Sequence, residues 1–308
     1  MKKLANVSRE EMISLLTQQG LLLRDISEKL EVTRNTLKSR LKELNINYLD
    51  YSDYRAKYNV FIFDNIDTEA KAYWLGFLYA DGNVRSDDSI HNNNTVSVEL
   101  SFVDYGHLIK FKTFMEDQRS DSIIRICERP AASGRMLKFA TYDTCNAHLR
   151  QSLINAGCLP NKSNILEFPD ESIFATKDLI YDFIRGYIDG DGCLSKTVGH
   201  GNRLALSIRG TKNFLEGIRN YFPQFTKVYS EVDNRTKTVQ HRLLCCSNKA
   251  DQVAYKLYEN SNIYLDRKFD KYATLCKLHH SEKLGNNGEG CDANTVITDS
   301  IAEGESVS

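Results

Sequence analysis

The chain has 308 residues and a formal net charge of −1, with 41% apolar and 26% charged residues. This length suffices for two or three domains, and the composition is that of a soluble globular protein. No apolar run reaches the roughly 20 residues of a membrane-spanning helix, and the first residues lack the apolar stretch of a signal peptide. The eight cysteines have no disulfide-framework spacing. We therefore expect reduced thiols and a cytoplasmic protein. The expected context is bacterial or phage, and an organelle is the alternative.

Charge is unevenly distributed along the chain. Residues 1–50 and 51–281 each carry +2, whereas residues 282–308 carry −5. The near-neutral total therefore does not exclude a nucleic-acid partner, because binding depends on where charges cluster. The last segment is rich in Gly, Asn, Ser and Glu and has no core pattern, which predicts a disordered acidic tail over 282–308.

Residues 8–46 show apolar positions at the spacing of three short helices. Thr33 is a good N-cap for the third, and residues 24–37 resemble a helix-turn-helix, in which the last helix enters the major groove. That helix carries four basic residues, Arg34, Lys38, Arg40 and Lys42. We expect a DNA-binding domain over 1–47; the alternative is a small helical packing module with a solvated charged face. A Tyr- and Asp-rich linker over 48–68 follows.

Two nonapeptides in different parts of the chain are closely similar: WLGFLYADG at 74–82 and IRGYIDGDG at 184–192. The elements that follow also recur, since each copy reads as helix, two strands, helix, two strands, helix. After the first nonapeptide we expect a polar loop through residue 94, then a strand over 96–102. The sequence predicts an α+β fold with repeat 1 at 69–165 and repeat 2 at 166–281.

Each nonapeptide ends an apolar helix in an aspartate followed by glycine. Helix C-termini carry a partial negative charge, so Asp81 and Asp191 are disfavoured there unless something offsets the cost. Small residues lie four positions apart on each helix, namely Gly76 with Ala80 and Gly186 with Gly190. Two such helices can pack backbone to backbone, which would bring both aspartates together at the centre of the domain. Nearby carboxylates repel unless cations neutralise them, which predicts a divalent-metal site. The alternative is a purely structural seam of small residues.

The paired nonapeptides resemble the duplicated signatures of LAGLIDADG homing endonucleases. Tyr79 departs from the signature at its sixth position, whereas the eighth is aspartate in both copies. The resemblance covers residues 69–281. It implies a pseudo-twofold αββαββα core with saddle-like sheets, and metal sites at Asp81, Asp191, Gly82 and Gly192. It also implies a single-chain monomer. We expect two or three Mg²⁺ ions, replaceable by Mn²⁺, and hydrolysis of one phosphodiester bond on each DNA strand.

A lysine follows each aspartate at a similar separation along the chain. Lys162 follows Asp81 in repeat 1, and Lys268 follows Asp191 in repeat 2. The family places a lysine late in each repeat near the hydrolytic water, where an ammonium group can stabilise developing charge. Both lysines are therefore expected to be catalytic; the alternative is two unrelated surface lysines.

DNA contacts are expected from the outward faces of the two sheets, because arginine, lysine, asparagine and glutamine suit phosphates and base edges. The candidates in repeat 1 are Arg85, Asn92, Asn93, Asn94, Arg125, Arg129, Arg135 and Lys138. Those in repeat 2 are Lys196, Arg203, Arg209, Arg235, Lys237, Gln240 and Arg242.

The resulting hypothesis is a metal-dependent, site-specific double-strand DNA endonuclease that leaves short 3′ overhangs, with a role in intron or gene mobility. Two alternatives share the fold. One is a non-catalytic transcription regulator, which would have lost the acids; the other is an intron-RNA maturase, against which the helix-turn-helix pattern argues.

Overall fold

The computed structural model describes residues 7–17, 23–44, 46, 56–86, 94–131, 133–197, 203–233 and 238–282. The chain forms two compact units, which divide after Val60. Within the described ranges, no helix combines the length and apolar character needed to cross a membrane. The candidates Asn92, Asn93, Arg235 and Lys237, and the expected tail from residue 283 onward, lie outside the described residues.

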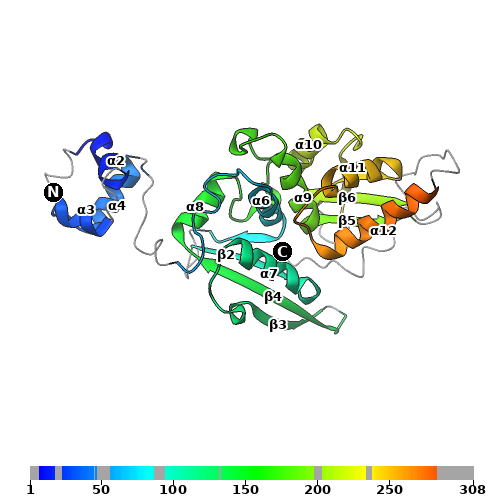
Figure 1. Ribbon diagram of the computed structural model, residues 1–308, viewed down its shortest axis with the longest axis horizontal. Coiled ribbons are helices and arrows are strands. Elements are labelled where there is room, and N and C mark those ends of the chain that lie inside the picture. The colour runs from blue at the N-terminus through cyan, green and yellow to red at the C-terminus, as the bar shows by residue number, and fades with distance from the viewer. Residues whose placement is uncertain are drawn as a thin grey trace. The chain divides into compact units, whose positions relative to one another are not determined.

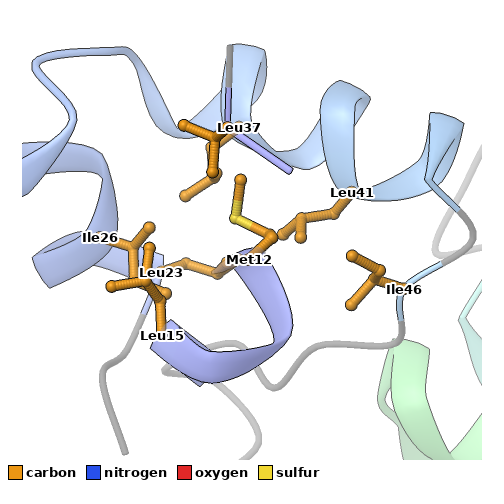
Figure 2. Packing of buried hydrophobic residues seen from close by; sticks show 8 residues of the cluster. Met12, Leu15, Leu23, Ile26, Leu37, Leu41 and Ile46 are labelled. Carbon is orange, nitrogen blue, oxygen red and sulfur yellow. The ribbon is translucent and has the colours of Figure 1, made fainter. Parts of the chain in front are cut away.

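The N-terminal unit contains the three expected helices, α2 (Arg9–Thr17), α3 (Leu23–Lys29) and α4 (Arg34–Glu43). Thr33 caps α4, because its hydroxyl accepts a hydrogen bond from the amide of Thr36. Between α3 and α4, Glu31 takes the left-handed conformation with φ 54°. Figure 2 shows the apolar side chains that hold the helices together: Met12, Leu15, Leu23, Ile26, Leu37, Leu41 and Ile46.

The second unit contains both repeats, which share the order helix, two strands, helix, two strands, helix; repeat 2 continues with one further helix at its C-terminal end. Repeat 1 comprises α6 (Glu69–Asp81), β1 (Gly82–Val84), β2 (Thr95–Ser101), α7 (Tyr105–Phe114), β3 (Arg125–Pro130), β4 (Met136–Cys145) and α8 (Ala147–Asn155). Repeat 2 comprises α9 (Leu179–Asp191), β5 (Gly192–Lys196), β6 (Leu204–Gly210), α10 (Lys212–Tyr221), β7 (Tyr229–Val232), β8 (Val239–Cys246), α11 (Asn248–Tyr258) and α12 (Asp266–Glu282). The two antiparallel sheets have matching strand orders, β1-β2-β4-β3 and β5-β6-β8-β7. The predicted duplicated α+β fold is therefore confirmed.

Each sheet has one face packed against helices. In β2, Val96, Val98 and Leu100 are buried, whereas the alternate residues are not. Alternation follows from strand geometry, so residues in register with Ser97 and Glu99 share the other face, which we call the open face. Figure 1 shows α6 and α9 side by side between the two sheets.

Three local features differ from the sequence expectation. Residues 83 and 84, expected in a polar loop, belong with Gly82 to strand β1, which pairs with β2 in a register that places Gly82 opposite Val98. Helix α12 was not predicted, and it carries Lys268. Val60, Ile62, Phe63 and Ile66, from the stretch expected as a linker, are buried, and Ile66 forms a parallel bridge with Phe174.

Candidate active site

The seam between α6 and α9 is closed by two glycines related by the internal repeat. A Cβ added at Gly76 would lie 1.9 Å from the carbonyl oxygen of Phe183, and one added at Gly186 would lie 1.9 Å from that of Tyr73. Residues 73 and 183 occupy equivalent positions in the two repeats. The contact is therefore reciprocal, and only glycine allows the backbones to approach this closely.

The two acidic helix ends meet at one end of this seam. Asp81 and Asp191 are the last residues of α6 and α9. A Cβ at Gly190 would lie 2.3 Å from the Cβ of Ala80 and 3.1 Å from Oδ2 of Asp81, so Asp81 lies directly against α9. The structure therefore brings together two carboxylates that lie in separate repeats of the sequence.

Both carboxyl groups have raised pKa values. Burial, followed by the charge of Asp191, raises the pKa of Asp81 to about 7. Burial also raises the pKa of Asp191, an effect opposed by the charge of Lys268 and by the nearby hydroxyl of Tyr187, whose proton is donated to the carbonyl oxygen of Arg209. Tyr187 has no counterpart hydroxyl in repeat 1, where Phe77 occupies the equivalent position. The paired acids thus carry negative charge that the protein alone only partly offsets.

Each lysine predicted from the repeat spacing contacts the glycine that follows its aspartate. The ammonium group of Lys162 donates to the carbonyl oxygen of Gly82. That of Lys268 donates to the carbonyl oxygen of Gly192 at 2.5 Å, and also to those of Ile188, Asp189 and Gly190. Burial lowers the pKa of Lys268, whereas the charge of Asp189 raises it. The equivalent contacts place one cation beside each acidic helix end.

The oxygens at the site fit a hard divalent cation. Among the described residues no group of three or more His, Cys, Asp or Glu side chains gathers as a metal site. Two carboxylates suit Mg²⁺, which keeps several water ligands and takes few from the protein. The charge of Asp191 raises the pKa of Asp81. A cation held between the two carboxylates would lower that pKa again. The carbonyl oxygens of Gly82 and Gly192 already accept from lysines, so any role as ligands would use their second lone pairs.

The sheet register places most basic candidates on the open faces. In repeat 1, Arg125 lies opposite Thr141 and Arg129 opposite Leu137, and the two arginines pair with Asp143 and Glu99. Arg85 continues the β1–β2 pairing, because its amide donates to Thr95. In repeat 2 the alternation places four candidates on the open face: Arg203, Arg209, Gln240 and Arg242. Arg242 pairs with Glu231 at 2.7 Å.

The outward-face prediction was wrong for two lysines. Lys138 is in register with Glu128, one residue out of phase with the open face, and its ammonium lies 4.1 Å from the ring centre of Phe102. Lys196 is in register with buried Leu204, so it too belongs to the helix-covered side. Both side chains are nevertheless exposed to solvent. Asn94 directly precedes β2, and Arg135 lies between β3 and β4.

In the N-terminal unit, the four basic candidates all lie on α4. Arg34 and Lys42 are exposed, Lys38 is partly exposed, and Arg40 is paired with Glu43 at 3.2 Å. Leu37 and Leu41 face the core, and Lys42 lies on the side of α4 that the core leaves free. Arg34, seven residues before Leu41, shares the core-facing side and is exposed at the start of the helix.

The raised pKa of Asp81 predicts a pH-dependent stability. The folded state binds a proton that the unfolded state has released by about pH 4, so this contribution is complete at low pH and is lost between about pH 4 and 7. We therefore compare the free energy of unfolding of Asp81→Asn with that of the wild type in EDTA. The difference in favour of the variant should be larger at pH 8 than at pH 5 by about 2 kcal/mol. That corresponds to about 4–8 °C in thermal unfolding. Mg²⁺ should raise the melting temperature of the wild type at pH 8 more than that of the variant. If the stabilities of the two proteins in EDTA changed with pH in the same way, the raised pKa of Asp81 would be contradicted.

No family model and no curated protein matches the chain. Solved structures similar to it include the homing endonuclease I-WcaI bound to its DNA recognition sequence, with 12% identity, 68% of this chain and 87% of that chain covered, and a TM-score of 0.47. They also include the LAGLIDADG homing endonuclease I-GzeII in complex with its DNA target, with 11% identity, coverage of 70% and 93%, and a TM-score of 0.44. The I-LtrWI LAGLIDADG homing endonuclease bound to target DNA has 11% identity, coverage of 74% and 94%, and a TM-score of 0.41. These similarities are too low to assign an activity, so the fold and site define the class: a duplicated α+β protein with paired acids at its internal interface.

Proposed function

We propose that the protein is a site-specific double-strand DNA endonuclease of the LAGLIDADG homing type. The observation that carries this proposal is the repeated arrangement at the seam, where Asp81 and Asp191 end adjacent helices and Lys162 and Lys268 each approach the following glycine. A structural seam explains Gly76 and Gly186, but it does not require an acid and a lysine at both helix ends.

Each acid and its neighbouring lysine would serve one DNA strand. Asp81 and Asp191 would hold divalent ions, with Mg²⁺ expected and Mn²⁺ as a substitute, and the bound metal supplies an activated water and neutralises charge on the phosphate. Lys162 and Lys268 would provide positive charge where it develops on the phosphate oxygens. Two such sets related by pseudo-twofold symmetry match the two strands of a duplex.

The open faces of the sheets would bind the DNA. Their arginines can contact phosphates and guanine edges, and the carboxylate partners of Arg125, Arg129 and Arg242 hold three of them in defined orientations. Helix α4 would add contacts as a recognition helix, with Arg34, Lys38 and Lys42 near its exposed surface.

Cleavage of a randomised duplex library tests the proposal without requiring a known target sequence. We expect a small set of sequences to be cut on both strands in Mg²⁺ or Mn²⁺, with a constant stagger between the two cuts, and no cutting in EDTA. Enrichment of bound duplexes with no cutting at any Mg²⁺ concentration would instead indicate a regulator. Preference for a folded intron RNA over every duplex would indicate a maturase.

The N-terminal unit provides a separate prediction. Deleting residues 1–46 should weaken binding to a selected duplex and flatten its salt dependence, with the slope of log K against log salt falling by about 2–4. The second unit should keep its own melting transition, because it forms a separate compact body. Titrations at several salt concentrations check this; an unchanged footprint and salt slope would remove the DNA-binding role of this unit.

A further inference from the structure

Asp189, at the sixth position of the second nonapeptide, is a buried carboxylate that joins three segments. Its side chain is 1% exposed. Its oxygens accept hydrogen bonds from the hydroxyl of Tyr258 at 2.6 Å, the hydroxyl of Tyr73 at 2.7 Å and the amide of Leu265 at 2.7 Å. Tyr73 belongs to α6, Tyr258 ends α11, and Leu265 directly precedes α12. Asp189 therefore links α9 to α6, to the end of α11 and to the residue that precedes α12.

Lys268 is the third residue of α12, and its amide donates to the carbonyl oxygen of Leu265, the residue that Asp189 contacts. Its ammonium is buried among four carbonyl oxygens, including that of Gly192, and the charge of Asp189 favours the cation. Two ion pairs from repeat 1 hold the same helix start. Lys110 contacts Asp266 at 2.5 Å, and Asp104 contacts Arg267 at 3.0 Å.

The equivalent position in repeat 1 is built differently. Tyr79 is neutral, and its hydroxyl donates to the carbonyl oxygen of Ala156 at 2.6 Å. Lys162 is partly exposed and donates to the carbonyl oxygen of Gly82, whereas Lys268 is 3% exposed. The two lysines thus occupy equivalent positions but are held by different supports.

We propose that Asp189 is a positioning residue that anchors the start of α12 and so holds the ammonium group of Lys268 at Gly192, beside Asp191. Its influence is confined to the half of the site that contains Lys268. This assignment rests on the proposed function in one respect, namely that Lys268 acts in the reaction.

Acetylation of lysines by a water-soluble succinimidyl ester, followed by mass spectrometry, tests the positioning without DNA or metal. In the wild-type chain Lys268 should react at least about tenfold more slowly than Lys177, whose side chain is 89% exposed. Asp189→Asn should raise the rate at Lys268 several-fold and leave those at Lys177 and Lys162 unchanged. Tyr258→Phe, which removes one hydrogen bond, should have a smaller effect in the same direction.

A general loss of stability would not give this pattern, because it would raise the reactivity of Lys162 as well. Unchanged labelling of Lys268 in both folded variants would overturn the proposal, and so would an equal rise at Lys162. If Asp189→Asn does not fold, the acetylation rate of Lys268 in Tyr258→Phe tests the proposal. Tyr79→Phe is the matched control in repeat 1, and it should leave the rate at Lys268 unchanged.

A selected duplex carrying a different dye on each strand tests the consequence for cleavage. Asp189→Asn should slow one strand by at least about tenfold, so that nicked product accumulates, while the other strand is cut at the wild-type rate. Equal slowing of both strands would contradict the confined influence of Asp189. A wild-type chain that cuts neither strand would refute the nuclease function, and the labelling result would still decide whether Asp189 positions Lys268.

Discussion

Replacing Asp81 or Asp191 by asparagine should reduce double-strand cleavage by at least about 10³-fold while leaving DNA affinity within a few-fold of wild type. Asparagine keeps the size of each side chain but removes the charge that would hold a cation. Since both carboxyl groups have raised pKa values, neutralising either one relieves repulsion in the metal-free protein and should not destabilise it.

Strand-resolved cleavage of a selected duplex and a parallel binding titration measure this effect. Asp178→Asn is the matched control, because Asp178 is an exposed aspartate at the opposite end of α9. The Asp178→Asn variant should cut both strands at the wild-type rate. If either seam variant cut both strands at the wild-type rate, the metal-binding role of the acids would be excluded.

Gly76→Ala and Gly186→Ala should each destabilise the second unit by more than about 4 kcal/mol, or prevent it from folding. The added Cβ would lie 1.9 Å from a backbone carbonyl oxygen of the other seam helix, so the helices would have to separate along the seam. Separation would expose apolar surface on both helices and move the acids apart.

Thermal unfolding of soluble protein checks the effect of these glycines. Gly106→Ala is the matched control, because Gly106 lies in α7 and an added Cβ there would meet nothing within 4 Å. It should be neutral or stabilising by up to about 1 kcal/mol. Normal melting of either seam variant would mean that the two helices do not pack as closely as the structure has them.

The internal repeat was the part of the fold that the sequence revealed most directly. Apolar periodicity located the helices and most strands, and small residues four apart identified the face on which α6 and α9 meet. The sequence did not reveal α12, because the helix begins with charged residues whose partners, Asp104 and Lys110, lie in the other repeat. Contacts of this kind depend on tertiary packing rather than on local pattern.

The site was recognised only in part for the same reason. Lys162 and Lys268 follow their aspartates at similar separations, which indicated that they occupy equivalent positions in the two repeats. The sequence did not indicate that Lys268 is buried among four carbonyl oxygens. Tyr79 at the sixth position departs from the signature and indicated that the two halves differ. In the structure its hydroxyl donates to Ala156, whereas Asp189 at the equivalent position accepts from the amide of Leu265. The misplacement of Lys138 and Lys196 arose because charge alone does not indicate strand register.

The most direct test of the central claim is anomalous scattering from crystals of the protein grown with a selected duplex and Mn²⁺. We expect manganese peaks within about 2.5 Å of carboxylate oxygens of both Asp81 and Asp191, adjacent to a phosphate of each DNA strand. Peaks elsewhere, with both carboxylates free of metal in a DNA complex, would contradict the claim that these helix ends form the catalytic centre.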